Sequence, residues 1–149
     1  MKVKVSNMCR ILDGHNVLVQ ERTKQDWPGI TFPGGKLEPK ESIVDSCIRE
    51  VKEECGLIVS HLELKGIVTY DVDHGHEYWL IFLFEAHSFE GELHPGDQED
   101  PIYWIDKDEL LAKPLSLDLE HYIKVYEDDS IQEMHATWIG DKAINIIFQ

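Results

Sequence analysis

The stretch GKLEPKESIVDSCIREVKEECGL, residues 35–57, decides the fold and concentrates the chemistry of this chain. Pro33 and the two glycines that follow it predict a turn that cannot continue a strand, and Pro39 keeps the next residues irregular. A helical pattern then opens at Glu41 and runs to Gly56. The stretch is therefore expected to be a loop that leads into one amphipathic helix.

The predicted helix has an apolar face beside an acidic one. The apolar stripe consists of Val44, Ile48, Val51 and Cys55, with Cys47 at its edge. Glu50, Glu53 and Glu54 share the neighbouring arc, where like charges destabilise an isolated helix by about 0.2–0.5 kcal/mol per pair. Mg²⁺ would offset that repulsion, because it prefers carboxylate oxygens and shares its remaining positions with waters and substrate phosphates. The helix pattern alone, however, favours an ordinary solvated acidic face.

The spacing of the charged residues and glycines changes this balance. They reproduce the pattern G-x5-E-x7-R-E-U-x-E-E-x-G-U, where U is a bulky apolar residue, here Val51 or Leu57. The fixed positions are Gly35, Glu41, Arg49, Glu50, Glu53, Glu54 and Gly56. So many matches arise by chance in about one such chain in a million or fewer. In this pattern the segment resembles the Nudix hydrolase family, and a looser resemblance extends from the first strands to about Ser130.

The resemblance implies an α/β/α sandwich, an α+β arrangement with a mixed β-sheet between helices, and hydrolysis that depends on Mg²⁺, with Mn²⁺ as an alternative. Glu53 and Glu54 would be metal ligands, assisted by the backbone carbonyl of Gly34. Glu50 occupies a position associated with metal binding or with general-base catalysis, and both roles stay open.

The four remaining positions of the motif would support the acids. Arg49 would pair with the helix carboxylates and with Glu41, so that it orients the metal ligands. Gly35 and Gly56 would serve backbone geometry, at the start of the loop and at the left-handed end of the helix.

A carboxylate outside the motif would complete the metal site. By resemblance it belongs to the loop GELHPGDQED, residues 91–100, where we slightly prefer Glu99 to Asp100. Surface solvation accounts equally well for either residue.

Candidate substrate contacts lie on both sides of the motif. Arg22 and Lys24 suit phosphates, although a surface salt bridge explains Arg22 equally well. Trp27 and Phe32 could stack on a base, but packing explains them better. Asp118 could accept hydrogen bonds from a purine, but a helix N-cap is its plainer role.

The sequence FPGGK before the acidic helix is similar to that of MutT-like enzymes. So is the later segment of loop, strand IYWID (residues 102–106) and helix. This similarity implies a nucleoside triphosphate pyrophosphohydrolase that acts on oxidised purine nucleotides, converting 8-oxo-dGTP to 8-oxo-dGMP and pyrophosphate. Family members with the same motif cleave ADP-ribose, dinucleoside polyphosphates or nucleotide sugars, because the motif acts on the diphosphate that these substrates share. A non-catalytic nucleotide-binding module is the alternative of another class, but every acid of the motif is present.

The whole chain predicts one globular domain. It has 149 residues, of which 42% are hydrophobic and 29% charged, and no apolar run approaches the roughly 20 residues of a spanning helix. A net charge of −15 argues against binding to a nucleic-acid polymer. Three cysteines argue against a disulfide framework, and the first residues read as a strand instead of a signal peptide. We expect a cytoplasmic monomer or homodimer with a small-molecule nucleotide substrate.

The remaining pattern is mostly strands. The predicted elements are strands at 2–12, 17–21, 62–72, 77–87 and 102–106, a helical turn at 106–111, a helix near 117–126 and a C-terminal hairpin at about 131–149. The hairpin is expected to be a sheet edge or an oligomer contact. His74 and His76 share a turn, but two histidines without a third ligand make an incomplete zinc site.

Overall fold

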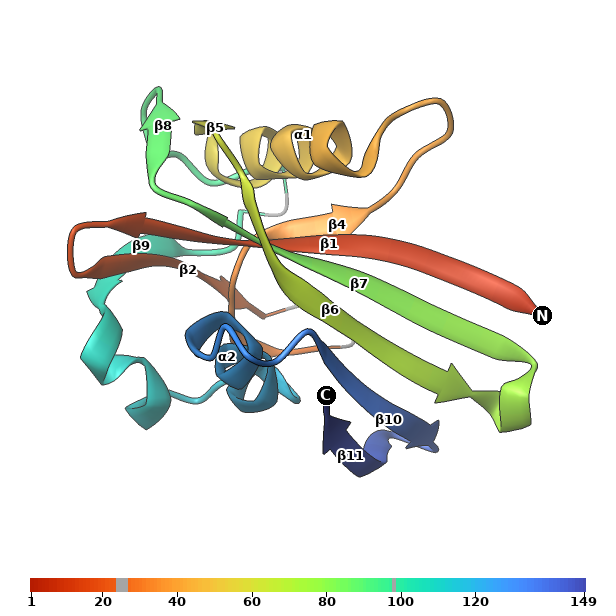
Figure 1. Cartoon of the computed structure of the whole chain (residues 1–149). Helices are drawn as coiled ribbons and strands as arrows, with labels where there is room; N and C mark the ends of the chain where they lie inside the picture. The colour runs from red at the N-terminus through yellow and green to blue at the C-terminus, as the bar shows by residue number, and fades with distance from the viewer. Residues whose placement is uncertain (24–26, 98) are drawn as a thin grey trace.

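Two strands that lie far apart in the sequence form the centre of the fold. In the computed structural model, which describes all residues except 24–26 and 98, β1 (Lys2–Asp13) runs parallel to β7 (Glu77–Ala86). Parallel neighbours need a long crossover connection, and this one contains helix α1 (Ile43–Cys55). The crossover therefore brings the motif against the central strands (Figure 1).

The sheet is mixed, as expected from the sequence. In the described part of the chain, nine strands join in the order β11-β10-β6-β7-β1-β2-β3, with β4 paired to β1 and β9 paired to β2. Their bounds are β2 (Asn16–Arg22), β3 (Gly29–Thr31), β4 (Gly34–Lys36), β6 (Glu63–Val72), β9 (Ile102–Asp106), β10 (Glu133–Ile139) and β11 (Lys142–Phe148). Strands β5 (Ile58–Ser60) and β8 (Ser88–Glu90) form a separate small sheet. The C-terminal hairpin is confirmed, and its second strand is a sheet edge.

The two α-helices cover opposite faces of the sheet (Figure 1). Helix α1 begins after Ser42, whose side chain accepts a hydrogen bond from the backbone N–H of Asp45 at 3.0 Å, and it ends at Gly56 with φ 78°. Helix α2 (Leu119–Glu127) packs against β6 and β10. Short 3₁₀ helices occupy Asp73–Gly75 and Lys107–Ala112. Within the described residues, every helix is too short or too polar to cross a membrane.

The sheet separates two hydrophobic cores. The core beneath α2 contains Val68, Tyr70, Leu83, Leu119, Tyr126 and Met134 among its buried residues. The core beneath α1 contains Cys9, Ile11, Leu18, Cys47, Val51, Cys55 and Phe84. The predicted stripe of α1 needs correction, because Val44 is 44% exposed whereas Cys47 is fully buried. Buried Ser46, which accepts a hydrogen bond from Asn7 on β1 at 2.9 Å, marks the face on which the helix docks.

The prediction that the two glycines cannot continue a strand is wrong. Gly34 and Gly35 belong to β4, which pairs antiparallel with Asn7 and Met8 of β1. A Cβ on Gly34 would lie 2.2 Å from the backbone oxygen of Asn7, so this close strand approach requires a glycine. The pairing fixes the loop before α1 to the centre of the sheet.

Candidate active site

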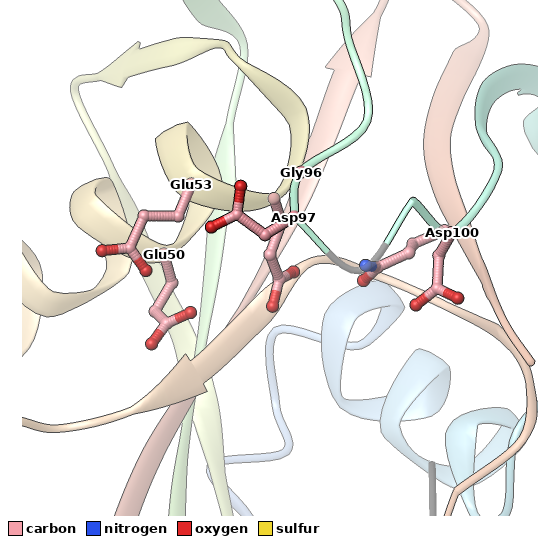
Figure 2. Close-up of a pocket in the computed structure, with 7 residues that line it drawn as sticks. Glu50, Glu53, Gly96, Asp97 and Asp100 are labelled. Atoms are coloured by element: carbon pink, nitrogen blue, oxygen red, sulfur yellow. The ribbon is translucent and has the colours of Figure 1, made fainter. Parts of the chain in front are cut away.

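An acidic pocket lies between α1 and the loop before β9. Its volume is about 250 Å³, and Figure 2 shows Glu50 and Glu53 projecting from the helix with Asp97 and Asp100 on the loop. The lining residues are Gln20, Glu50, Glu53, Glu54, Gly96, Asp97 and Asp100. The structure thus brings the three predicted helix carboxylates together with two loop carboxylates, and it adds Gln20, which no sequence pattern singled out.

One guanidinium organises the helix side of this pocket. Arg49 donates to Glu41 from Nε at 3.0 Å and from Nη2 at 2.8 Å, and its Nη1 donates to Glu50 at 3.0 Å and to Glu53 at 3.2 Å. Nη2 also donates to the carbonyl oxygen of Lys36 at 3.0 Å. The hydrogen bond from Arg49 is the main cause that lowers the pKa of Glu41 to about 2. The expected pairing of Arg49 with Glu41 and the helix acids is therefore confirmed.

Glu50 lies close to the loop, and Gly35 makes room for it. A Cβ on Gly35 would lie 2.2–2.5 Å from the carboxyl atoms of Glu50. The role expected for Gly35 was backbone freedom, but its φ is not positive, and the reason for a glycine here is space for this side chain. Burial raises the pKa of Glu50, while the hydrogen bond from Arg49 opposes that shift.

Glu54 carries the most perturbed carboxyl group of the pocket. Burial raises its pKa to about 8, against the lowering effect of a hydrogen bond that its Oε2 accepts from the backbone N–H of Gly34 at 3.2 Å. The charges of Glu50 and Asp100 raise this pKa further, whereas Arg22 lowers it. Arg22 therefore lies near the acids, as a phosphate-binding residue would.

The loop carboxylates differ from the expected one. Asp97 and Asp100 line the pocket, whereas Glu99 is exposed and is not a lining residue. Asp100 is only 4% exposed, and its Oδ1 accepts from the backbone N–H of Thr23 at 3.4 Å and from the hydroxyl of Thr23 at 3.2 Å. The preference for Glu99 is thus not supported by the geometry.

The last turn of α1 holds this loop in place. The backbone N–H of Gly96 donates to the carbonyl oxygen of Glu54 at 2.9 Å, and that of His94 donates to Cys55 at 3.0 Å. A Cβ on Gly96 would lie 2.3 Å from the carbonyl oxygen of Glu53. These contacts place Asp97 beside the helix. In the sequence, Gly96 is the residue that signals this close approach.

The predicted substrate contacts have separate outcomes. Phe32 is 2% exposed and packs edge-on against Tyr126, with ring centroids 5.5 Å apart, so its selection as a substrate contact is wrong. Trp27 is half-buried and packs against Trp138 at 4.9 Å. Lys24 lies outside the described residues.

Asp118 precedes α2, but its side chain does not cap the helix. Its φ of 67° is left-handed, and its Oδ2 instead accepts a hydrogen bond from the hydroxyl of Tyr70 at 2.8 Å. The Tyr70 ring in turn lies 5.7 Å from the rings of Trp79 and Trp138. Asp118 and Trp27, which the sequence separates widely, therefore belong to one polar and aromatic cluster.

The oxygen donors of the acidic pocket fit a hard divalent cation. Five carboxylates surround it, and burial first, then the charges of Glu50 and Asp100, raise the pKa of Glu54. Among the described residues, the one trio of histidine and acidic side chains whose ligand atoms all lie within 4.8 Å is exposed, at His15, Asp106 and Asp108. No three pocket carboxylates of the described chain converge as closely, and Arg49 donates hydrogen bonds to two of them, Glu50 and Glu53.

Known proteins share this fold and motif. The chain is 33% identical over 116 residues to the uncharacterised Nudix hydrolase YvcI of Bacillus subtilis, covering 76% of this chain and 72% of that protein. It is 31% identical to the ADP-ribose pyrophosphatase of Methanocaldococcus jannaschii, covering 75% of this chain and 66% of that one.

A solved structure agrees over nearly the whole length. The mutator MutT protein of Bacillus halodurans superposes with a TM-score of 0.83 at 29% identity, covering 98% of this chain and 97% of that one. The NUDIX domain family matches residues 2–126, which include both the helix acids and the loop acids of the pocket. The chain therefore belongs to the Nudix hydrolase family.

Proposed function

We propose that this protein is a Mg²⁺-dependent pyrophosphohydrolase of the MutT-like type, which converts an oxidised purine nucleoside triphosphate such as 8-oxo-dGTP to the monophosphate and pyrophosphate. The observation that carries this proposal is the acidic pocket, which Glu50, Glu53 and Glu54 of α1 line together with Asp97 and Asp100 of the loop. Such a set of oxygen donors suits a cation shared with a diphosphate.

Glu53 and Glu54 would hold the metal, with Asp97 or Asp100 as the loop ligand. When bound, the metal supplies neutralisation of the charge on the phosphoryl oxygens. Glu54 is positioned by the N–H of Gly34, and the exposed Glu53 is free to rotate from Arg49 toward a ligand. The carbonyl of Gly34 remains a proposed ligand.

Glu50 would accept the proton of the attacking water. Its Oε1 is oriented by Arg49, so its Oε2 is the oxygen that can face a water. Partial burial raises its pKa and makes it a stronger base than a solvated carboxylate. Arg22 near Glu54 would contact the phosphates on the open side of the pocket.

The likeness to the Bacillus halodurans MutT protein over 98% of the chain supports the MutT-like type of activity proposed for this protein. ADP-ribose is the second candidate, because the Methanocaldococcus jannaschii relative at 31% identity is an ADP-ribose pyrophosphatase. Both substrates contain the diphosphate that the acidic pocket would bind, so the choice depends on the rest of the ligand.

The test is a comparison of kcat/KM with Mg²⁺ for 8-oxo-dGTP, dGTP, ADP-ribose and a dinucleoside polyphosphate. The proposal predicts a strong preference for 8-oxo-dGTP with pyrophosphate as product. Glu53→Gln should lower turnover by orders of magnitude at an unchanged melting temperature, because it removes the charge of a ligand at nearly constant shape. Glu109→Gln removes the same charge at an exposed position away from the pocket and should have no effect.

A preference for ADP-ribose would be consistent with the proposed metal site but would refute the proposed triphosphate substrate. Wild-type turnover of Glu53→Gln at saturating Mg²⁺ would overturn the metal assignment. If the wild-type protein hydrolysed none of the four compounds, the result would favour a nucleotide-binding module without catalysis.

A further inference from the structure

Three tryptophans from distant parts of the chain meet on the face of the sheet that α2 covers. Trp27 precedes β3, Trp79 lies on β7 and Trp138 on β10. Their ring centroids are 4.9 Å apart for Trp27 and Trp138, 5.4 Å for Trp79 and Trp138, and 6.3 Å for Trp27 and Trp79. All three are only partly buried, so part of each indole is open to solvent or to a ligand.

A second pocket opens beside these rings. Its volume is about 360 Å³, within the usual range for small-molecule sites, and it is separate from the acidic pocket. Trp79 and Trp138 form its aromatic lining, while Asp73 and His74 of the β6–β7 turn and Thr137 add polar groups. The indole N–H of Trp138 donates to the carbonyl oxygen of Gly140 at 3.0 Å, which helps to fix the ring at the pocket wall.

Along β1, the positions that adjoin the two pockets lie four residues apart. On β1, Lys4 pairs with Trp79, and Met8 pairs with Gly34, whose N–H binds Glu54. Four residues of strand span about 13 Å, the scale of an extended nucleotide. Arg22 also lies near the acids, and Trp27 lies at the tryptophans.

The two pockets suit opposite ends of one ligand. The acidic pocket can hold phosphates only with a cation, and the protein as a whole is strongly acidic, so the anionic end of a ligand belongs at the metal. Indole faces bind uncharged planar rings by stacking, and an acceptor such as the Asp73 carboxylate suits exocyclic amino groups.

We propose that the C-terminal hairpin β10–β11 completes a base-binding subsite, in which Trp138 and Trp79 hold the base of the nucleotide whose diphosphate occupies the acidic pocket. This inference rests on the proposed function. The hairpin lies beyond residues 2–126 that the NUDIX domain matches, and it joins the sheet through pairing of Trp138 with Val72. Substrate choice would thus be set in part by an addition to the family domain.

The first measurement is quenching of tryptophan fluorescence by guanosine, adenosine and ribose 5-phosphate without Mg²⁺. The two nucleosides should quench and ribose 5-phosphate should not. Trp138→Leu keeps an apolar side chain but lacks an aromatic face, and it should raise the Kd of the nucleosides by about 5- to 150-fold. Trp138→Phe should restore most of the affinity. Ile147→Ala, an exposed position on β11, should leave Kd unchanged and controls for damage to the hairpin.

The second measurement is steady-state kinetics on the best substrate found for the protein. Trp138→Leu should raise KM by the same factor and leave kcat and the Mg²⁺ dependence near their wild-type values. Equal KM and equal nucleoside Kd for Trp138→Leu and wild type would overturn the subsite. Nucleoside binding that depends on Trp138, in a protein that hydrolyses no nucleotide, would support the subsite and overturn the proposed function instead.

Discussion

Arg49 donates two hydrogen bonds to the carboxylate of Glu41, from Nε at 3.0 Å and from Nη2 at 2.8 Å. Its third nitrogen, Nη1, is thereby directed at Glu50 and Glu53. Glu41 lies outside the pocket, so it acts on the pocket only through the guanidinium that it orients. This arrangement separates a positioning role from direct contact with the metal or substrate.

Glu41→Gln should lower kcat/KM and the apparent Mg²⁺ affinity by about 10- to 100-fold, since loss of a residue that orients metal ligands typically has this effect. The glutamine side chain has only one acceptor oxygen and no charge, so it can neither accept both hydrogen bonds from Arg49 nor form an ion pair with it. Arg49 would then no longer hold Glu50 in place. Kinetics at several Mg²⁺ concentrations measures both effects. Glu38→Gln is the control, because Glu38 is exposed and lies 3.6 Å from Arg49. Equal loss in both variants would refute the specific role of Glu41.

Glu54 should make the metal-free protein less stable as the pH rises. Its pKa is about 8 in the folded state against an ordinary value of 4.5, so between these pH values the folded state binds more protons than the unfolded state. The free energy of unfolding therefore falls as the pH rises from about 4.5 to about 8. Urea denaturation across this range should show the decline in wild type and a weaker decline in Glu54→Gln. Identical pH profiles would rule out a buried, protonated Glu54.

The same proton should leave when Mg²⁺ binds, because a carboxylate ligand must be deprotonated. At pH 7 the carboxyl of Glu54 is largely protonated, so binding should release close to one proton, and the release should fall to about half at pH 8 and vanish well above it. Calorimetric titration in two buffers of different ionisation enthalpy counts the protons. Glu54→Gln serves as the reference without this group, and a release that persists in it would assign the proton to another residue.

Asp100 and Glu99 are neighbours that the structure distinguishes sharply. Asp100 is buried and lines the pocket, whereas Glu99 is exposed. Asp100→Asn should therefore lower kcat/KM by about 10-fold or more, while Glu99→Gln should match wild type within error. If Glu99→Gln were the impaired variant, the loop would rearrange on ligand binding and the sequence-based choice would be restored.

Local signals made the helix and its acids predictable from the sequence. Ser42 caps the start of α1 and Gly56 ends it in a left-handed conformation, and both effects depend on residues within one turn. The hairpins and long strands follow in the same way from alternation and turn residues. The mixed sheet between two helices was expected from the assembled strands and helices, and the resemblance of the motif to a known family implied the same arrangement.

Long-range contacts account for what the sequence did not predict. Phe32 looked available in a loop rich in glycine and proline, yet its environment is set by Tyr126 on α2. The buried face of α1 is rotated toward Cys47 because Ser46 binds Asn7 on a distant strand. Asp100, and not Glu99, lines the pocket, and its carboxylate accepts a hydrogen bond from Thr23. Residue spacing does not predict that contact.

Replacement of the adjacent glycines Gly34 and Gly35 by alanine should have different effects, on stability in one case and on activity in the other. At Gly34 the new Cβ would lie 2.2 Å from the backbone oxygen of Asn7, which β4 and β1 cannot relieve without separating. Gly34→Ala should therefore lower the free energy of unfolding by about 1–3 kcal/mol or more. Thermal and urea denaturation measure this loss.

At Gly35 the new Cβ would meet only the carboxyl end of Glu50, which is flexible and can move away. Gly35→Ala should therefore keep near wild-type stability but displace Glu50, and a shift of about 1 Å in a catalytic group can cost about 100-fold in rate. Each variant is the control for the other, since both add one methyl group to β4. A stable, fully active Gly35→Ala would show that the position of Glu50 is unimportant for turnover and would remove it from the catalytic assignment.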